Sequence, residues 1–102
     1  MPAMVTLVAH LKAKPGKEEE TKQTLLSLVG PTRQEAGCLD YHLHQCDDDP
    51  ALFLFYENWR EQKDLDEHLT MPYLKDLFDK KDDLLAEEID IKLYTMLSER
   101  SS

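Results

Sequence analysis

Residues 51–59, which read ALFLFYENW, form the strongest strand signal in the chain and decide its fold. From residue 52 to residue 56 the side chains are apolar or aromatic without a polar break, so the segment lacks the alternation of a strand with one wet face. A strand of this kind must be covered on both of its faces. We therefore expect helices on one side of it and a second apolar layer on the other.

Three other segments alternate between apolar and polar side chains, as strands do when one face is buried. They are residues 4–12, 38–46 and 89–94. Residues 47–50 (DDDP) are typical of a tight turn, because Asp and Pro both favour turn backbones. This turn predicts a hairpin between residues 38–46 and residues 51–59.

The first helix is expected to follow the turn after the first strand. We place its start at three acidic residues, Glu18, Glu19 and Glu20, because acidic side chains favour the positive end of a helix dipole. Gly30-Pro31 should break or kink it near Val29. We expect one more helical turn, closed by Gly37 as a C-terminal cap.

A pair of helices is expected next, over residues 62–69 and from Thr70 to about Leu85. The order of elements is then strand, helix, strand, strand, helix pair, strand. This is the split βαβ, ferredoxin-like arrangement, an α+β domain with one antiparallel sheet and helices on one face. At 102 residues the chain is one domain, with a core over about 4–97 and a frayed tail over 98–102.

The second face of this sheet has no cover within one chain. Phe53, Phe55 and their neighbours cannot all lie beneath two helices, and a contiguous apolar patch of roughly several hundred Å² usually marks an interface. The simplest cover is the same face of a second copy, related by a twofold axis. We therefore predict a homodimer with two sheets packed face to face.

Charge and cysteine content limit the partners and the compartment. Lys and Arg number 12 against 21 Asp and Glu, for a formal net charge of −9, which makes nucleic acid and anionic membrane poor partners. Cys38 and Cys46 would lie roughly 26 Å apart on one strand, too far for a disulfide. With no signal peptide and no run of about 18 apolar residues, we expect free thiols and a cytoplasmic location.

Titratable and aromatic side chains gather late in the strongest strand and in the helices after it: Tyr56, Glu57, Asn58, Trp59, His68 and Tyr73. Strand geometry places Glu57 and Trp59 on one face and Tyr56 and Asn58 on the other. His68 is expected to turn toward the sheet, where an imidazole between an aromatic ring and an acid suits acid–base chemistry. The same spacing also fits His68 as a satisfied core histidine and Trp59 as a core anchor.

Three short pieces together resemble the antibiotic biosynthesis monooxygenase family, especially its quinol-monooxygenase-like members. They are residues 36–41 (AGCLDY), 55–59 (FYENW) and 68–73 (HLTMPY), within a resemblance that covers roughly residues 5–97. The family fold is a dimeric α/β barrel of ferredoxin-like subunits, which agrees with the architecture predicted above. Members share their fold more than their reaction.

The resemblance implies oxygenation of a phenol or hydroquinone by O2 without a metal, flavin or other cofactor. The substrate supplies the electrons, and the protein supplies an apolar pocket, a partner for the hydroxyl group and exclusion of water. The site residues that it implies are His68 as the base, Trp59 and Tyr41 as pocket residues, Tyr73 and Asn58 as hydrogen-bond donors to a carbonyl or peroxy oxygen, and Glu57 as a residue that orients a neighbour.

Other interpretations stay open. A non-catalytic dimeric module that binds a small ligand or serves a stress response would use the same fold, and so would an isomerase. Many relatives carry a second His just after the proline, where this chain has Tyr73, which argues against a two-histidine mechanism. Heme-degrading relatives carry an Asn on the first strand, where this chain offers Ala9 and His10, and this disfavours that reaction.

Overall fold

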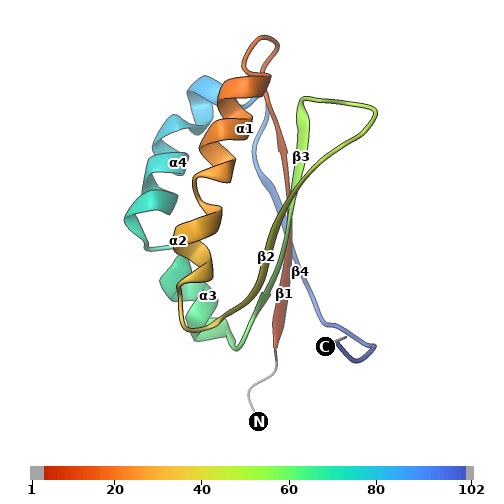
Figure 1. Ribbon diagram of the computed structural model, residues 1–102, viewed down its shortest axis with the longest axis vertical. Helices are drawn as coiled ribbons and strands as arrows, with labels where there is room; N and C mark the ends of the chain where they lie inside the picture. The colour runs from red at the N-terminus through yellow and green to blue at the C-terminus, as the bar shows by residue number, and fades with distance from the viewer. Residues whose placement is uncertain (1–3, 101–102) are drawn as a thin grey trace.

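In the computed structural model, which describes residues 4–100, a four-stranded antiparallel sheet carries helices on one of its faces (Figure 1). The strands are β1 (Val5–Lys12), β2 (Cys38–Gln45), β3 (Leu52–Trp59) and β4 (Asp90–Tyr94), and the helices are α1 (Glu18–Leu26), α2 (Val29–Arg33), α3 (Gln62–His68) and α4 (Pro72–Leu84). The order across the sheet is β2-β3-β1-β4. This is the predicted α+β, ferredoxin-like fold.

The register of β3 decides which side chains meet the helices. Ala9 of β1 and Leu43 of β2 flank Phe55, and alternate residues of a strand share a face, so Phe53 and Trp59 point the same way. Phe53 is 1% exposed and Phe55 is 3% exposed. The expectation that these two rings need a second copy as cover is therefore wrong, because strand alternation turns both toward the helices.

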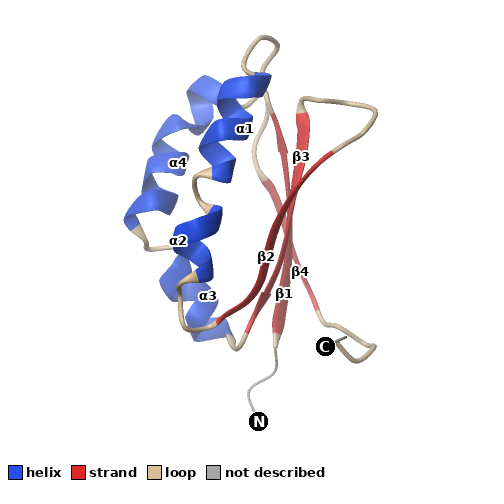
Figure 2. Cartoon of the chain, in the orientation of Figure 1, coloured by secondary structure: helices blue, strands red, loops and turns tan. Residues whose placement is uncertain are grey.

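The sheet face turned away from the helices, called the open face below, carries no helix among the described residues (Figure 2). The segment after β4 covers one end of it, where Arg100 binds Asp40. Val8 pairs with Tyr56, and Leu54 lies two residues along β3 from Tyr56, on the same face. All three side chains are half-buried. They form the apolar centre of the open face, in place of the two phenylalanines that we expected there.

The interruption after α1 falls where the sequence predicts it. The first helix ends at Leu26, and α2 begins at Val29. Gly30 and Pro31 lie in the first turn of α2, where a missing backbone N–H removes no intrahelical hydrogen bond. The dipeptide therefore opens a new short helix and does not end the old one.

Gly37 has a different role from the predicted C-terminal cap. Among the described residues only Gly16 has a positive φ, so Gly37 is not in the left-handed conformation that such a cap requires. A Cβ atom at Gly37 would lie closer than 3.0 Å to the Cβ and Cγ atoms of Asp64 in α3. Gly37 is needed because α3 approaches the start of β2 so closely.

The cysteines are free, as predicted: Cys38 is half-buried and Cys46 exposed. Of the tail expected to be frayed, Arg100 lies against Asp40, with its Nε atom 2.7 Å from a carboxylate oxygen, and residues 101 and 102 lie outside the described residues. Within residues 4–100, no helix combines the length and the apolarity needed to cross a bilayer.

Candidate functional site

An apolar cavity of about 40 Å³ lies between the sheet and the two later helices. The sheet contributes Leu7, Ala9 and Phe55, and α4 contributes Leu74 and Leu77. A water molecule needs roughly 10–15 Å³ of such volume, so the cavity accommodates a few waters. It accommodates an aromatic ring only after its walls move apart.

The cavity has a mouth beside β4. By register Ile91 and Leu93 lie on the helix side of the sheet, opposite Ala9 and Leu7. They are nevertheless 46% and 54% exposed, so the described helices leave this edge of the sheet partly open. Ile91 lines the cavity together with Leu69, which is 39% exposed. The path into the cavity is therefore apolar.

His68, the last residue of α3, is the imidazole on the cavity wall. It is 2% exposed, and its ring centroid lies 4.5 Å from that of Trp59 and 5.6 Å from that of Tyr41. Its Nδ1 atom lies 2.9 Å from Oε2 of Glu35. Burial lowers the pKa of His68, and the hydrogen bond to Glu35 opposes that shift. The imidazole is therefore neutral at pH 7 and able to accept a proton.

Glu57 is the carboxyl group of the same cavity. It is 4% exposed, and its Oε1 atom accepts a hydrogen bond of 2.9 Å from Nε1 of Trp59. Burial raises the pKa of Glu57 to about 7, against the lowering effect of the Trp59 hydrogen bond. Near neutral pH this side chain can therefore either donate or accept a proton.

Two polar atoms of the cavity residues, one on His68 and one on Glu57, are available to a ligand. Among the described residues, the fully buried side-chain nitrogen and oxygen atoms without a hydrogen-bond partner are the hydroxyl oxygens of Thr21 and Thr32. The hydrogen bonds of His68 and Glu57 with other described residues use Nδ1 and Oε1, which leaves Nε2 and Oε2 for a ligand, and both residues line the cavity. A ligand with a hydroxyl group would find an acceptor and a titratable carboxyl there.

Glu35 is the site residue that sequence reasoning missed. It lies in the connection between α2 and β2, and its Oε2 atom is hydrogen-bonded to both His68 and Tyr73. No periodicity or motif marks this acid, because its partners are 33 and 38 residues away in the sequence. Tyr73, expected as a donor to the ligand, instead donates its hydroxyl hydrogen to Glu35.

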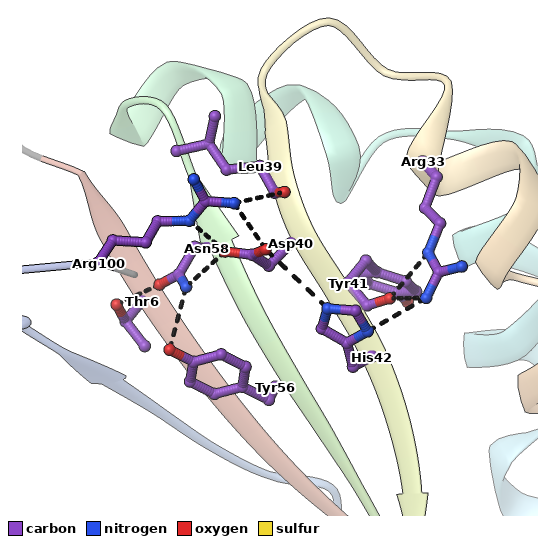
Figure 3. Close-up of polar contacts among 9 residues, drawn as sticks. All are labelled: Thr6, Arg33, Leu39, Asp40, Tyr41, His42, Tyr56, Asn58 and Arg100. Atoms are coloured by element: carbon purple, nitrogen blue, oxygen red, sulfur yellow. Dashed lines mark hydrogen bonds and ion pairs between the residues drawn. The ribbon is translucent and has the colours of Figure 1, made fainter. Parts of the chain in front are cut away.

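Asn58 lies on the open face, across the sheet from His68. Its side-chain nitrogen donates to Asp40 over 2.9 Å and to the Tyr56 hydroxyl over 3.1 Å, and its oxygen accepts from Thr6 over 2.5 Å (Figure 3). The Arg100 hydrogen bond, which is the largest influence on Asp40, lowers the pKa of this carboxyl to about 2. The structure therefore ties Asn58 into a separate polar cluster.

The structure thus divides the six residues proposed for the site. His68, Glu57 and Tyr41 line the cavity, and Trp59 packs on the His68 ring from behind. Tyr73 reaches His68 through Glu35, and Asn58 faces away. Within residues 4–100, no group of three or more His, Cys, Asp or Glu side chains is arranged to hold a metal ion.

Comparisons with known proteins point in one direction. The sequence model of the family described as "Antibiotic biosynthesis monooxygenase" matches residues 4–80. "Putative monooxygenase YcnE" of Bacillus subtilis (strain 168) is 30% identical over 96 residues, which cover 94% of this chain and 100% of that protein. The crystal structure of PA3566 from Pseudomonas aeruginosa has a TM-score of 0.90 at 35% identity, over 96% of this chain and 98% of that one.

A longer relative matches over part of its length. "Uncharacterized protein sll1783" of Synechocystis sp. is 34% identical over 90 residues, which cover 88% of this chain. The match covers 61% of that protein, so this chain spans less than two thirds of it.

Proposed function

The chain belongs to the antibiotic biosynthesis monooxygenase family, and from this premise we propose that it is a monooxygenase that adds one atom of O2 to a phenol or hydroquinone bound beside His68 and Glu57. The observation that carries the proposal is a buried imidazole beside a buried carboxyl group on the wall of a cavity whose other lining side chains are apolar or aromatic. The name of YcnE, a putative monooxygenase, supports the same reaction class.

The reaction begins with the transfer of the phenolic proton to Nε2 of His68. The resulting phenolate gives one electron to O2, and the superoxide and the phenoxyl radical combine to form a carbon–oxygen bond. The O–O bond of this peroxide then breaks, one oxygen atom stays on the ring as a carbonyl group, and the other leaves as water. A hydroquinone plus O2 thus yields a hydroxyquinone plus water, and all four electrons come from the substrate.

The apolar walls contribute by excluding water. An anionic phenolate in a dry cavity is held by fixed protein groups and not by a shifting hydration shell. Glu57 suits the second oxygen of a hydroquinone, because a carboxyl with a pKa of about 7 can donate to it or accept from it. Tyr41 belongs to the same wall, since it pairs with Glu57 across the sheet and its ring lies 5.6 Å from that of His68.

Admission of an aromatic ring requires movement at the mouth. The cavity of about 40 Å³ is smaller than a hydroquinone ring, so we expect Leu69 and Ile91 to separate when the substrate enters. Both side chains are more than a third exposed, so they have room to turn. We expect the natural substrate to present one apolar edge toward this mouth.

We further propose that the protein is a homodimer in the cytoplasm. The open face, with Val8, Leu54 and Tyr56 at its centre, suits the same face of a second copy. The free thiols of Cys38 and Cys46 fit a reducing compartment. The cavity lies on the helix side of the sheet, so this dimer would leave it accessible.

Oxygen uptake with a panel of hydroquinones and polyphenols tests the proposed activity. We expect uptake by the wild-type protein and a loss on the order of 10² or more in the His68→Gln variant, which removes the base. The matched control is His44→Gln, because His44 is exposed on the open face. Absence of uptake with every substrate, or equal uptake by wild type and His68→Gln, would favour the non-catalytic binding module.

A further inference from the structure

We propose that Glu35 is a positioning residue of this site, whose carboxylate fixes the His68 ring with hydrogen on Nδ1 and leaves Nε2 as the proton acceptor. The inference rests on the proposed function for its catalytic meaning. Which ring nitrogen of His68 carries the hydrogen can be measured without any substrate.

The geometry places three elements around one carboxylate oxygen. Oε2 of Glu35, from the α2–β2 connection, lies 2.9 Å from Nδ1 of His68 at the end of α3. The same oxygen accepts the hydroxyl hydrogen of Tyr73 in α4. The Glu35 side chain is 10% exposed, so little water competes for it. Glu35 therefore joins three separate elements at the cavity.

The chemistry of the groups determines the direction of the hydrogen bond. An ionised carboxylate only accepts hydrogen bonds, whereas a neutral imidazole has one donor nitrogen and one acceptor nitrogen. If Nδ1 donates to Glu35, the lone pair must lie on Nε2, the nitrogen of this cavity-lining ring that Glu35 does not occupy. The opposite tautomer would place two acceptors against each other and leave a donor where the substrate hydroxyl arrives.

The ring cannot easily turn to escape this arrangement. Trp59 packs against it at 4.5 Å between centroids, and Tyr41 meets it edge-on at 5.6 Å. The other titratable groups around the ring are Tyr41 of β2, Glu57 of β3 and Tyr73 of α4. Of these groups, Glu35 alone makes a hydrogen bond to the imidazole. It is the group that selects the tautomer and favours the imidazolium formed after proton transfer.

The first experiment is nitrogen NMR of the His68 ring in the substrate-free protein. We expect hydrogen on Nδ1 and not on Nε2 near pH 7 in the wild type. Glu35→Gln should shift the population toward the Nε2-protonated form, because an amide can donate to Nδ1. The matched control is Glu67→Gln, an exposed acid on the same helix, which should leave the ring unchanged. Hydrogen on Nε2 in the wild type would overturn the proposal.

The second experiment measures kcat and its pH profile with a substrate that the wild type oxidises. We expect Glu35→Gln to lower kcat on the order of 10²-fold and to move the acidic limb of kcat/KM to lower pH, since Glu35 raises the pKa of His68. Glu35→Asp should restore part of kcat, and Glu67→Gln should match the wild type. A limb that does not move in Glu35→Gln would reduce Glu35 to a structural residue.

The two proposals fail in different ways. If no substrate is oxidised but the NMR shows the expected tautomer and its loss in Glu35→Gln, the positioning of His68 stands and the monooxygenase activity does not. If oxidation depends on His68 but neither the tautomer nor kcat responds to Glu35→Gln, the activity stands and the role of Glu35 is wrong.

Discussion

Glu57 is a carboxyl group enclosed by apolar side chains, so its protonation must affect the stability of the fold. Its pKa rises from an ordinary value of 4.5 to about 7. Between these pH values the folded state keeps a proton that the unfolded state has lost, so stability falls as pH rises. Each pH unit in this window contributes about 1.4 kcal/mol, or about 3 kcal/mol in all.

We therefore predict that the free energy of unfolding of Glu57→Gln, relative to that of the wild type, increases by about 3 kcal/mol when the pH is raised from 5 to 8. His68 works in the opposite direction, because its lowered pKa reduces stability as pH falls below its ordinary value. Both proteins retain His68, so the difference isolates Glu57. Urea unfolding at the two pH values measures it. A difference that is the same at both would contradict the burial argument.

Trp59 gives a second test at the scale of one residue. Its side chain is 0% exposed, so Trp59→Ala should cost about 3–5 kcal/mol, the range for deletion of a large core ring. Trp59→Phe should cost less, and it removes the hydrogen bond that lowers the pKa of Glu57. Urea unfolding at pH 7 checks both variants. A change below about 1 kcal/mol in Trp59→Ala would show that the ring is not a core anchor.

The contrast between His68 and Glu35 shows which residues of a site a sequence reveals. His68 is predictable, because its place on an apolar helix side turns it toward the sheet. Glu35 reaches His68 over 33 residues of sequence, and only the folded path of the chain brings them together. Asn58 is informative in a different way: strand alternation already placed it on the face opposite Glu57, and its assigned role as a ligand donor overlooked that geometry.

At the scale of elements, the position of α3 depends on Gly37, because this residue has no side chain. The chain at Gly37 passes so close to Asp64 that a Cβ atom would overlap the Asp64 side chain. Asp64 cannot easily move, because both its carboxylate oxygens accept hydrogen bonds from Arg60, over 3.0 and 3.1 Å. The backbone N–H of Arg60 also donates to the Gly37 carbonyl over 2.8 Å. This contact fixes the start of the helix that carries His68.

We predict that Gly37→Ala destabilises the fold by about 1–3 kcal/mol, as overpacking does in a filled site. The matched control is Gly30→Ala, because a Cβ at Gly30 meets no heavy atom within 4 Å beyond its chain neighbours and the backbone of its own helix, and alanine is the better helix former in α2 by about 0.5–1 kcal/mol. Thermal unfolding should therefore move in opposite directions for the two variants. Equal shifts would show that Asp64 yields without cost.

The elements themselves were largely predictable, and the reason is local. Strand alternation and the Gly30-Pro31 break depend on neighbours within a few residues, and the strands and helices lie close to the predicted ranges. The role of Gly37 depends on Asp64, which is far away in the sequence, so a local rule for helix ends gave the wrong explanation. The prediction for Phe53 and Phe55 was wrong for a related reason, since a continuous apolar run does not indicate which face of the sheet each ring occupies.

At the scale of the whole molecule, the described helices lie on one side of the sheet, and the open face carries only the segment after β4 at its Asp40 end (Figure 2). Its centre is apolar, with Val8, Leu54 and Tyr56, and charged groups such as Asp40 and Lys92 stand nearer its edges. An apolar centre within a polar rim is the usual anatomy of a protein interface. The open face therefore favours a second copy as its partner.

We predict that the wild-type protein has a solution mass near twice the 11.9 kDa of the chain, and that Leu54→Asp shifts it toward the monomer. A carboxylate at the centre of two packed sheets would be buried without a partner, which is costly, whereas in the monomer it would face water. Leu26→Asp is the matched control, because Leu26 is 44% exposed on α1, away from the open face. Light scattering at micromolar concentration measures all three proteins. A wild type at 11.9 kDa, or equal dissociation by both variants, would remove the open face as the site of dimerisation.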